Sequence, residues 1–109
     1  MINASVRFTA SLEKVQNLRD VLMSVLGQTQ AMPECISCRL YQEESNPKSW
    51  LLLEEWASEE GLRRHVKSEA YRVVLEAMEL SSETPEVKFL MENKVEGFEL
   101  IESIRSEKE

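Results

Sequence analysis

The chain has 109 residues, a formal net charge of −7 and a sequence pI of about 4.8, and these values exclude several classes of protein. A single domain of this length buries roughly 65% of the surface that its unfolded chain exposes. Binding to nucleic acid or to an anionic membrane needs a basic patch, and this acidic sequence has none. We expect a soluble, cytoplasmic domain, because neither a leader segment nor a membrane-spanning apolar run is visible.

The first half of the chain predicts a strand, a helix and a hairpin. Residues 2–9 alternate between apolar and polar side chains, which is typical of a half-buried strand. Ser11 is expected to cap a helix whose apolar residues recur every three or four positions as far as Gly27. Residues 35–44 and 49–57 are then predicted as two strands, joined by an Asn-Pro-Lys turn.

The second half predicts two short helices and a last strand. Ser58 and Ser68, each followed by glutamate, are expected to cap the helices, and apolar residues alternate again over 87–95. The resulting order βαββαβ predicts an α+β, ferredoxin-like domain over residues 1–96 with a four-stranded antiparallel sheet. The tail at 97–109 suits either a helix or a strand, and we expect it to contribute to a dimer.

The strand at 49–57 carries large apolar side chains on both of its faces. One face holds Trp50, Leu52, Glu54 and Trp56, and the other holds Leu51, Leu53 and Glu55. Two helices cover only one side of the sheet, and each large apolar side chain left in water forfeits about 1.5–3 kcal/mol. A two-fold dimer, with sheets face to face, is the simplest cover for the second side. The alternative is that the tail folds back over it.

The same alternation assigns side chains to the side of the sheet away from the helices. Ile36, Cys38 and Leu40 are expected under the helices, together with the apolar residues of the first strand. Aromatic walls with convergent polar groups on the far side are typical of a small-molecule pocket. They are equally typical of a polar dimer interface with paired Arg and Glu, and the sequence leaves both interpretations open. The expected far-side residues are Arg7, Arg39, Tyr41, Trp50, Leu52, Glu54 and Trp56.

Two stretches resemble the antibiotic biosynthesis monooxygenase (ABM) family. Residues 32–41 are similar to the proline-glycine-cysteine strand start of that family. Residues 50–65 are similar to its most distinctive block, in which a strand ends in Glu-x-Trp, a Ser-capped helix follows, and a His comes nine residues after the Trp. Residues 68–71 fit the next helix start. The likeness spans roughly residues 2–96 and implies a homodimeric α+β barrel.

The resemblance also implies an activity. The best-understood members oxidise phenolic anthrones or quinols with molecular oxygen and use neither a metal nor a flavin, so no cofactor is expected. Trp56 matches the family tryptophan. Anthrone oxygenases carry an Asn and a Tyr where this chain has Leu52 and Leu62, and haem-degrading members carry a Trp and an axial His where it has His65 and Leu75. The quinol-monooxygenase-like branch, in which His65 is usual, is the closest match.

Three residues are the catalytic candidates. His65 is the only histidine and suits acid–base chemistry near neutral pH, although it could equally be a packed side chain bonded to a carbonyl or carboxylate. Glu54 could be a general base or a partner for one of the arginines, and Trp56 could be a ring-stacking group or a core anchor. The expected substrate-binding residues are Arg7, Arg39, Tyr41, Trp50 and Leu52.

Cys35 and Cys38 form a Cys-x-x-Cys motif that we do not interpret as a redox or metal site. Residues three apart on a regular strand point to opposite faces, so the thiols should diverge. A single histidine and no second cysteine pair leave too few ligands for zinc within one chain.

The sequence therefore favours a cofactor-independent monooxygenase that acts on a small phenolic or quinol-type compound. A non-catalytic module of the same fold that binds a small molecule is the alternative, because leucines stand where specialised oxygenases carry polar groups. Isomerase-like chemistry on a small sugar-derived signal, which occurs in the family, is a third hypothesis.

Overall fold

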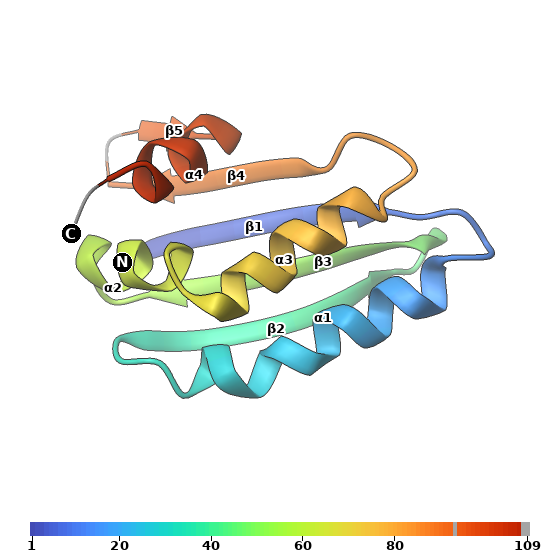
Figure 1. The fold of residues 1–109 in the computed structure, drawn as a ribbon, viewed down its shortest axis with the longest axis horizontal. Helices are drawn as coiled ribbons and strands as arrows, with labels where there is room; N and C mark the ends of the chain where they lie inside the picture. Colours follow the sequence, from blue (N-terminus) through green and yellow to red (C-terminus); the bar gives the residue numbers. More distant parts are fainter. Residues whose placement is uncertain (93, 108–109) are drawn as a thin grey trace.

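The computed structural model describes residues 1–92 and 94–107, which form an α+β domain with a single sheet (Figure 1). The elements in chain order are β1 (Ile2–Thr9), α1 (Val15–Gln30), β2 (Cys35–Glu43), β3 (Asn46–Trp56), α2 (Glu59–Val66), α3 (Glu69–Glu79), β4 (Glu86–Met91), β5 (Lys94–Glu96) and α4 (Phe98–Arg105). This arrangement confirms the predicted ferredoxin-like class.

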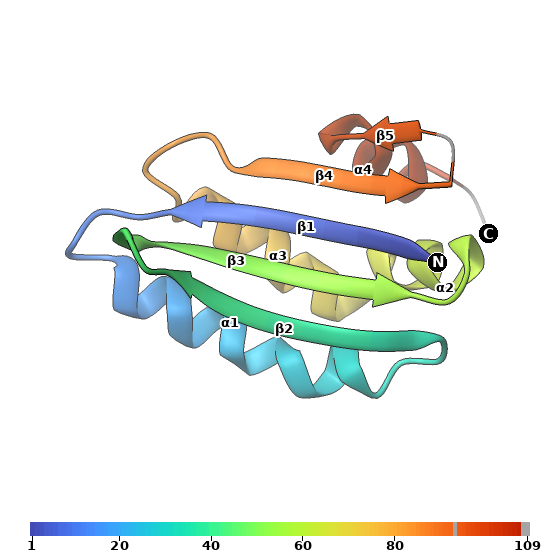
Figure 2. The same cartoon turned by 180° about the vertical axis from the view of Figure 1, so that it is seen from behind.

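The sheet is antiparallel, with strand order β2-β3-β1-β4-β5. It has one strand more than expected, because the segment predicted as a single strand at 87–95 is a hairpin of β4 and β5 in which Leu90 pairs with Val95. The helices lie on one face of the sheet, whereas the view from behind shows the other face bare (Figure 2). The C-terminal segment is a helix, and it lies on the covered side.

The predicted serine caps mark the starts of two of the three predicted helices. The Ser58 and Ser68 hydroxyls accept hydrogen bonds from the backbone N–H groups of Gly61 and Tyr71, at 3.1 and 3.2 Å, so both predicted caps are confirmed. The first helix differs, because Ser11 opens a turn and α1 begins only at Val15. This helix also continues past Gly27 to Gln30, since its last turn buries Thr29 in the core.

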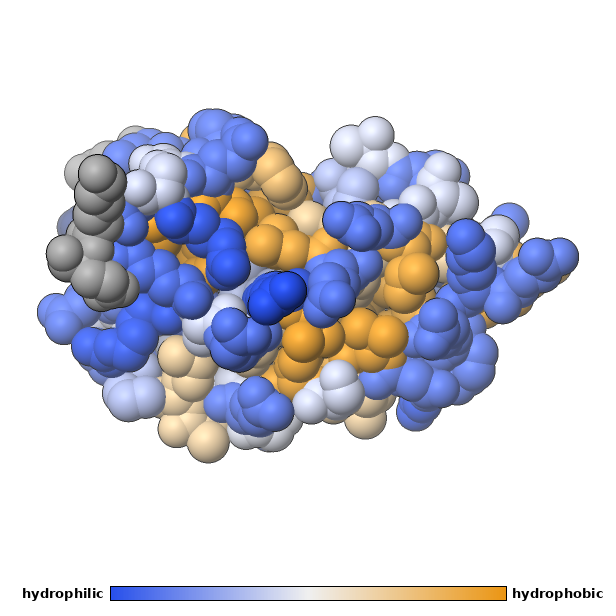
Figure 3. Space-filling view, viewed as in Figure 1, coloured by the Kyte–Doolittle hydropathy of each residue, from blue (hydrophilic) through white to orange (hydrophobic). Residues whose placement is uncertain are grey.

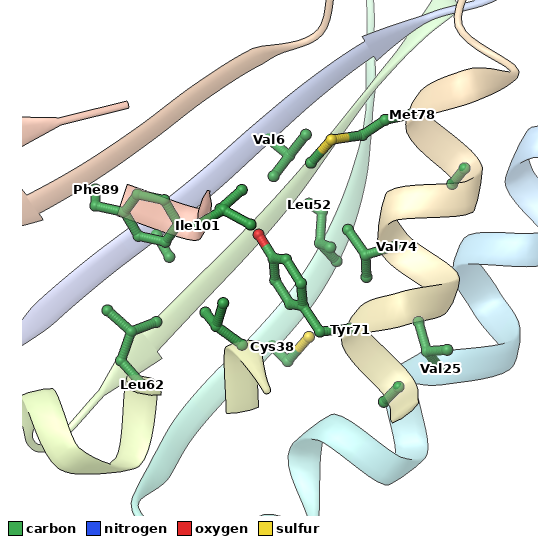
Figure 4. Packing of buried hydrophobic residues seen from close by; sticks show 14 of the residues in the cluster. Val6, Val25, Cys38, Leu52, Leu62, Tyr71, Val74, Met78, Phe89 and Ile101 are labelled. Carbon is green, nitrogen blue, oxygen red and sulfur yellow. The ribbon is translucent and has the colours of Figure 1, made fainter. Parts of the chain in front are cut away.

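The core lies between the sheet and the helices (Figure 4). Phe8 and Phe89 from the sheet and Leu18 and Leu22 of α1 belong to this core, and each of these side chains is almost fully buried. On the outer surface of the helix layer, Val21 and Val73 line a shallow apolar groove between α1 and α3, where apolar atoms show between charged side chains (Figure 3).

The strand register corrects the predicted far side of the sheet. Val6 pairs with Leu52, and directly paired residues share a face. Trp50, Leu52, Glu54 and Trp56 were predicted to lie on the side of the sheet away from the helices, and this prediction was wrong. The sequence alone does not fix the register of β3, and a one-residue change of register moves every side chain of a strand to the other face. The set that lies on the helix side, and not opposite it, is Trp50, Leu52, Glu54 and Trp56.

The open face is nevertheless partly apolar. Leu51 and Leu53 of β3 lie there, and Tyr41 and Leu90 beside them are 45% and 47% exposed. Among the described residues the C-terminal segment does not cover this face, so the alternative in which the tail folds back over it is wrong.

A β-bulge changes the interpretation of the cysteine motif. The register of β2 against β3 shifts between Cys35 and Ser37, so Cys35 pairs with Trp56 and Cys38 pairs with Glu54. Both cysteines consequently face the helix side, and the prediction that they diverge was wrong because it assumed a regular strand. Both thiols are free.

Candidate functional site

A buried acid–base pair lies where β3 meets α2. The Nε2 atom of His65 is 3.2 Å from Oε2 of Glu54, and the indole N–H of Trp56 donates to Oε1 of the same carboxyl group at 2.9 Å. All three residues are at most 3% exposed. Glu54 is therefore contacted from two directions, by the indole N–H and by the imidazole, away from bulk water, and a buried carboxyl group is tolerated only with such partners.

The local sequence explains how these side chains meet. Glu54 and Trp56 are two residues apart on β3, so they share a face. The Ser58 cap then turns the chain into α2, which brings His65 back over the end of the strand. The imidazole stacks on the Trp56 indole, with ring centroids 4.8 Å apart and an interplanar angle of 27°. The Glu-x-Trp to His spacing is thus the spacing of a strand, a cap and two helical turns.

The imidazole of His65 has a contact at each ring nitrogen. The Nδ1 atom is 3.2 Å from the sulfur of Met32. A thioether has no hydrogen to donate and is a weak acceptor, so this contact is a hydrogen bond only when Nδ1 carries the proton. The Nε2 atom faces the Glu54 carboxyl group, so a proton can pass between these two groups.

The loop that carries Met32 is fixed firmly against α2. Glu34 has a φ of 69°, the left-handed conformation that glycine adopts most easily, and it stands at the glycine of the family's Pro-Gly-Cys pattern. Its carbonyl accepts the N–H of Ala57 at 2.9 Å. A side chain at Gly61 would lie only 2.9 Å from the Glu34 Cβ atom, so the loop and the helix are closely packed. This packing holds Met32 on the imidazole.

Tyr71 completes the cluster, and the sequence did not single it out as a functional residue. Its ring stands edge-on to His65, with centroids 5.1 Å apart and an angle of 90°. Its hydroxyl is buried and has no hydrogen-bond partner within residues 1–92 and 94–107. Tyr71 falls in the apolar stripe of α3 and so resembles an ordinary core residue. The one available signal was a phenol hydroxyl in a stripe of aliphatic residues.

The charge of Glu54 extends to neighbouring groups. Burial, and after it the nearness of Glu54, raise the pKa of Tyr71 well above its ordinary value. The same two causes raise the pKa of the Cys38 thiol. Tyr71 is therefore a neutral donor, and Cys38 is an unreactive thiol and not a nucleophile.

The structure separates the remaining candidates into two groups. Trp50 and Leu52 lie on the same side of the sheet as the acid–base pair, whereas Arg7, Arg39 and Tyr41 lie on the open face. Arg7 binds Glu43 at 2.6 Å and Glu86 at 3.1 Å there. Glu54 is consequently not the partner of Arg7, and the expectation that all these residues share one pocket was wrong, again because the β3 register was not known.

A metal site is not formed by the residues that the structure describes, since no three His, Cys, Asp or Glu side chains group together closely enough to hold an ion. No helix in the described ranges is long and apolar enough to cross a membrane.

The sheet topology, the buried Glu-x-Trp and the histidine that stacks on it define a class of protein. Residues 1–77 match the antibiotic biosynthesis monooxygenase family, and the chain belongs to that family. No curated protein matches the sequence.

Solved structures agree with this assignment at the level of the fold. A conserved protein from Methanosarcina mazei Go1 is 26% identical, with a TM-score of 0.77 over 84% of this chain and 92% of the other. Rv0793 from Mycobacterium tuberculosis is 23% identical, with a TM-score of 0.77 over 85% and 95%. A protein named antibiotic biosynthesis monooxygenase is 17% identical, with a TM-score of 0.75 over 86% and 100%.

Proposed function

We propose that the protein is a cofactor-independent monooxygenase of a small phenolic or quinol-type compound, and that Glu54 and His65 together accept the proton of the substrate hydroxyl. The observation that carries the proposal is the 3.2 Å contact between His65 Nε2 and Glu54 Oε2 in a buried site with aromatic walls. Such a pair takes up a proton on one residue while the other balances the charge.

The proposed reaction balances with oxygen as the only co-reactant. Loss of its proton makes a phenol electron-rich enough to reduce O2. One oxygen atom then enters the ring as a second carbonyl and the other leaves as water. For 1-naphthol this is C10H8O + O2 → C10H6O2 + H2O, with naphthoquinone as the product. The protein would accept the proton, hold the ring and exclude water from the intermediates.

Each site residue has a proposed role in this reaction. His65 and Glu54 form the base, and the Trp56 indole, by donating to Glu54, orients the carboxyl group. Trp50 and Leu52 would supply apolar contact to the ring. Tyr41, which lies on the open face, is not assigned to the ring.

We also propose that the protein acts as a homodimer in the cytoplasm. Leu51 and Leu53, with the exposed Tyr41 and Leu90, form an apolar strip on the sheet face that no described helix covers (Figure 2). Arg7 and Arg39 at this face would then serve the dimer contact and not the substrate. Two copies with their sheets face to face would remove the strip from water.

Oxygen uptake by metal-free protein tests the catalytic proposal. With 1-naphthol we expect consumption of one O2 per naphthoquinone formed, and a loss of at least 100-fold in rate for His65→Ala and Glu54→Gln. Glu55→Gln is the matched control: it makes the same change one residue away, on the open face, where Glu55 accepts a hydrogen bond from Ser37. Full activity of Glu54→Gln, or equal losses in both glutamine variants, would contradict the assigned roles.

One observation favours a second function. Leu52 and Leu62 are buried where anthrone oxygenases carry polar groups, so the cluster could bind a phenolic compound without turning it over. In that case 1-naphthol would raise the melting temperature in the presence of air, while the oxygen concentration stayed constant. Oxygen consumption above the buffer rate would exclude this alternative.

A further inference from the structure

We propose that α4 is a lid over the ligand site, and that the Tyr71 hydroxyl donates a hydrogen bond to the oxygen of a phenolic ligand once this helix moves away. The ligand class rests on the proposed function. The site and its cover rest on the contacts of Tyr71 and of α4.

The Tyr71 hydroxyl is buried without a hydrogen-bond partner among the described residues. A buried O–H group without an acceptor is costly, and such groups are rare in folded proteins. The Tyr71 hydroxyl has no partner within the described residues, and its raised pKa keeps it protonated. It is therefore a donor ready for an acceptor that the chain itself does not supply. A phenol or phenolate oxygen is an acceptor of suitable chemistry, and it would lie beside the imidazole that Tyr71 contacts.

Helix α4 lies against the Tyr71 hydroxyl (Figure 4). The Tyr71 oxygen points toward Ile101 of α4 (Figure 4). Leu100, Ile101 and Ile104 are all at most 5% exposed, so α4 inserts a compact apolar surface into the core beside the cluster. If α4 withdrew, it would leave an apolar space with one hydrogen-bond donor in its wall. Such a space fits an aromatic ring that carries a hydroxyl group.

A ligand has no open path to the acid–base pair among the described residues. Glu54, Trp56 and His65 are at most 3% exposed, so a ligand reaches them only if a covering element moves. Helix α4 is the element that lies against the Tyr71 hydroxyl (Figure 4). It follows Gly97 without a side-chain cap and lies beyond residues 1–77, the part that matches the family.

The attachments of α4 to α2 are few and lie near the surface. Arg105 donates to the backbone carbonyl of Val66 at 2.6 Å. Glu107, just after the helix, binds Arg63 and also Lys67, the latter at 3.1 Å. Exposed ion pairs of this kind contribute little to stability and are screened by salt. The main cost of releasing the helix is therefore the exposure of its apolar side chains, which the buried ring of a ligand would offset in part.

Hydrogen exchange with and without 1-naphthol, under anaerobic conditions, tests the lid. We expect the ligand to speed exchange of the amides of residues 98–105 and to leave those of α1 unchanged. Glu107→Gln, which removes the negative charge of both ion pairs, should speed the same amides without ligand and tighten 1-naphthol binding several-fold. Glu102→Gln is the matched control, because it removes the same charge from an exposed position of α4.

Binding constants measured by calorimetry test the role of Tyr71. Tyr71→Phe should weaken 1-naphthol binding by about 2- to 10-fold, the usual effect of one lost hydrogen bond. It should leave the binding of naphthalene, which has no oxygen, unchanged. Equal affinity of wild type and Tyr71→Phe for 1-naphthol would remove the hydroxyl from the site.

The outcomes separate this inference from the proposed function. Binding with faster exchange in α4, but without oxygen uptake in air, would support the lid and contradict the monooxygenase. Binding that left the α4 amides unchanged, or no binding by any variant, would overturn the lid whatever the oxygen measurements showed.

Discussion

Removing one oxygen atom from Tyr71 is expected to make the protein more stable. The hydroxyl is buried without a partner in the described residues, and an unsatisfied buried donor costs about 1–3 kcal/mol. Tyr71→Phe keeps the ring and its edge contact with His65, and leaves only a small gap. We therefore expect the free energy of unfolding to rise by about 1 kcal/mol, or the melting temperature by about 4 °C. Urea unfolding followed by tryptophan fluorescence measures the change.

The other tyrosine provides the control for this experiment. Tyr41 is 45% exposed on the open face, so Tyr41→Phe should change the free energy of unfolding by less than about 0.5 kcal/mol. A loss of 1 kcal/mol or more in Tyr71→Phe would refute the reasoning, because it would mean that the hydroxyl is hydrogen-bonded in the folded protein. A gain in stability together with weaker ligand binding is the combination expected of a residue kept for function.

Three further results are expected. Glu34→Gly should raise the free energy of unfolding by about 0.5–1 kcal/mol in urea titrations, because glycine adopts a φ of 69° without strain; a loss of stability would contradict this. Leu53→Lys should give a monomer of 12.6 kDa in analytical ultracentrifugation. Wild type and Met23→Lys, which changes the outer side of α1, should give twice that mass. A dimer that persists in Leu53→Lys would argue against the open-face contact. Burial raises the pKa of the Cys38 thiol in the folded state, whereas the unfolded chain loses this proton near pH 9. Above that pH the free energy of unfolding in urea titrations should therefore fall by up to about 1.4 kcal/mol per pH unit. Cys38→Ala should reduce this dependence of stability on pH.

The parts of the fold that depend on neighbouring residues could be predicted from the sequence. The Ser58 and Ser68 caps are confirmed, because a cap depends mainly on its own first turn, whereas the Ser11 cap was wrong because α1 begins only at Val15. The sequence also named Glu54, Trp56 and His65 as separate catalytic candidates, but it did not predict that Glu54 pairs with His65.

The parts that depend on distant pairing could not be predicted. The face of β3 that meets the helices is set by its register against β1, and alternation alone fits either face. The bulge between Cys35 and Ser37, which turns both thiols to one side, has no local glycine to announce it. Tyr71 was missed for a similar reason: only the packed structure shows that its hydroxyl lacks a partner.

The proposed function depends most on the contact between Glu54 and His65, and nitrogen NMR of the imidazole tests this contact directly. His65 is the only histidine, so its two ring nitrogens give unambiguous signals. We expect Nδ1 to be protonated at neutral pH, and we expect Glu54→Gln, but not Glu55→Gln, to shift the Nε2 resonance. A spectrum in which Nδ1 carries no proton, or in which both variants leave Nε2 unchanged, would contradict the central claim.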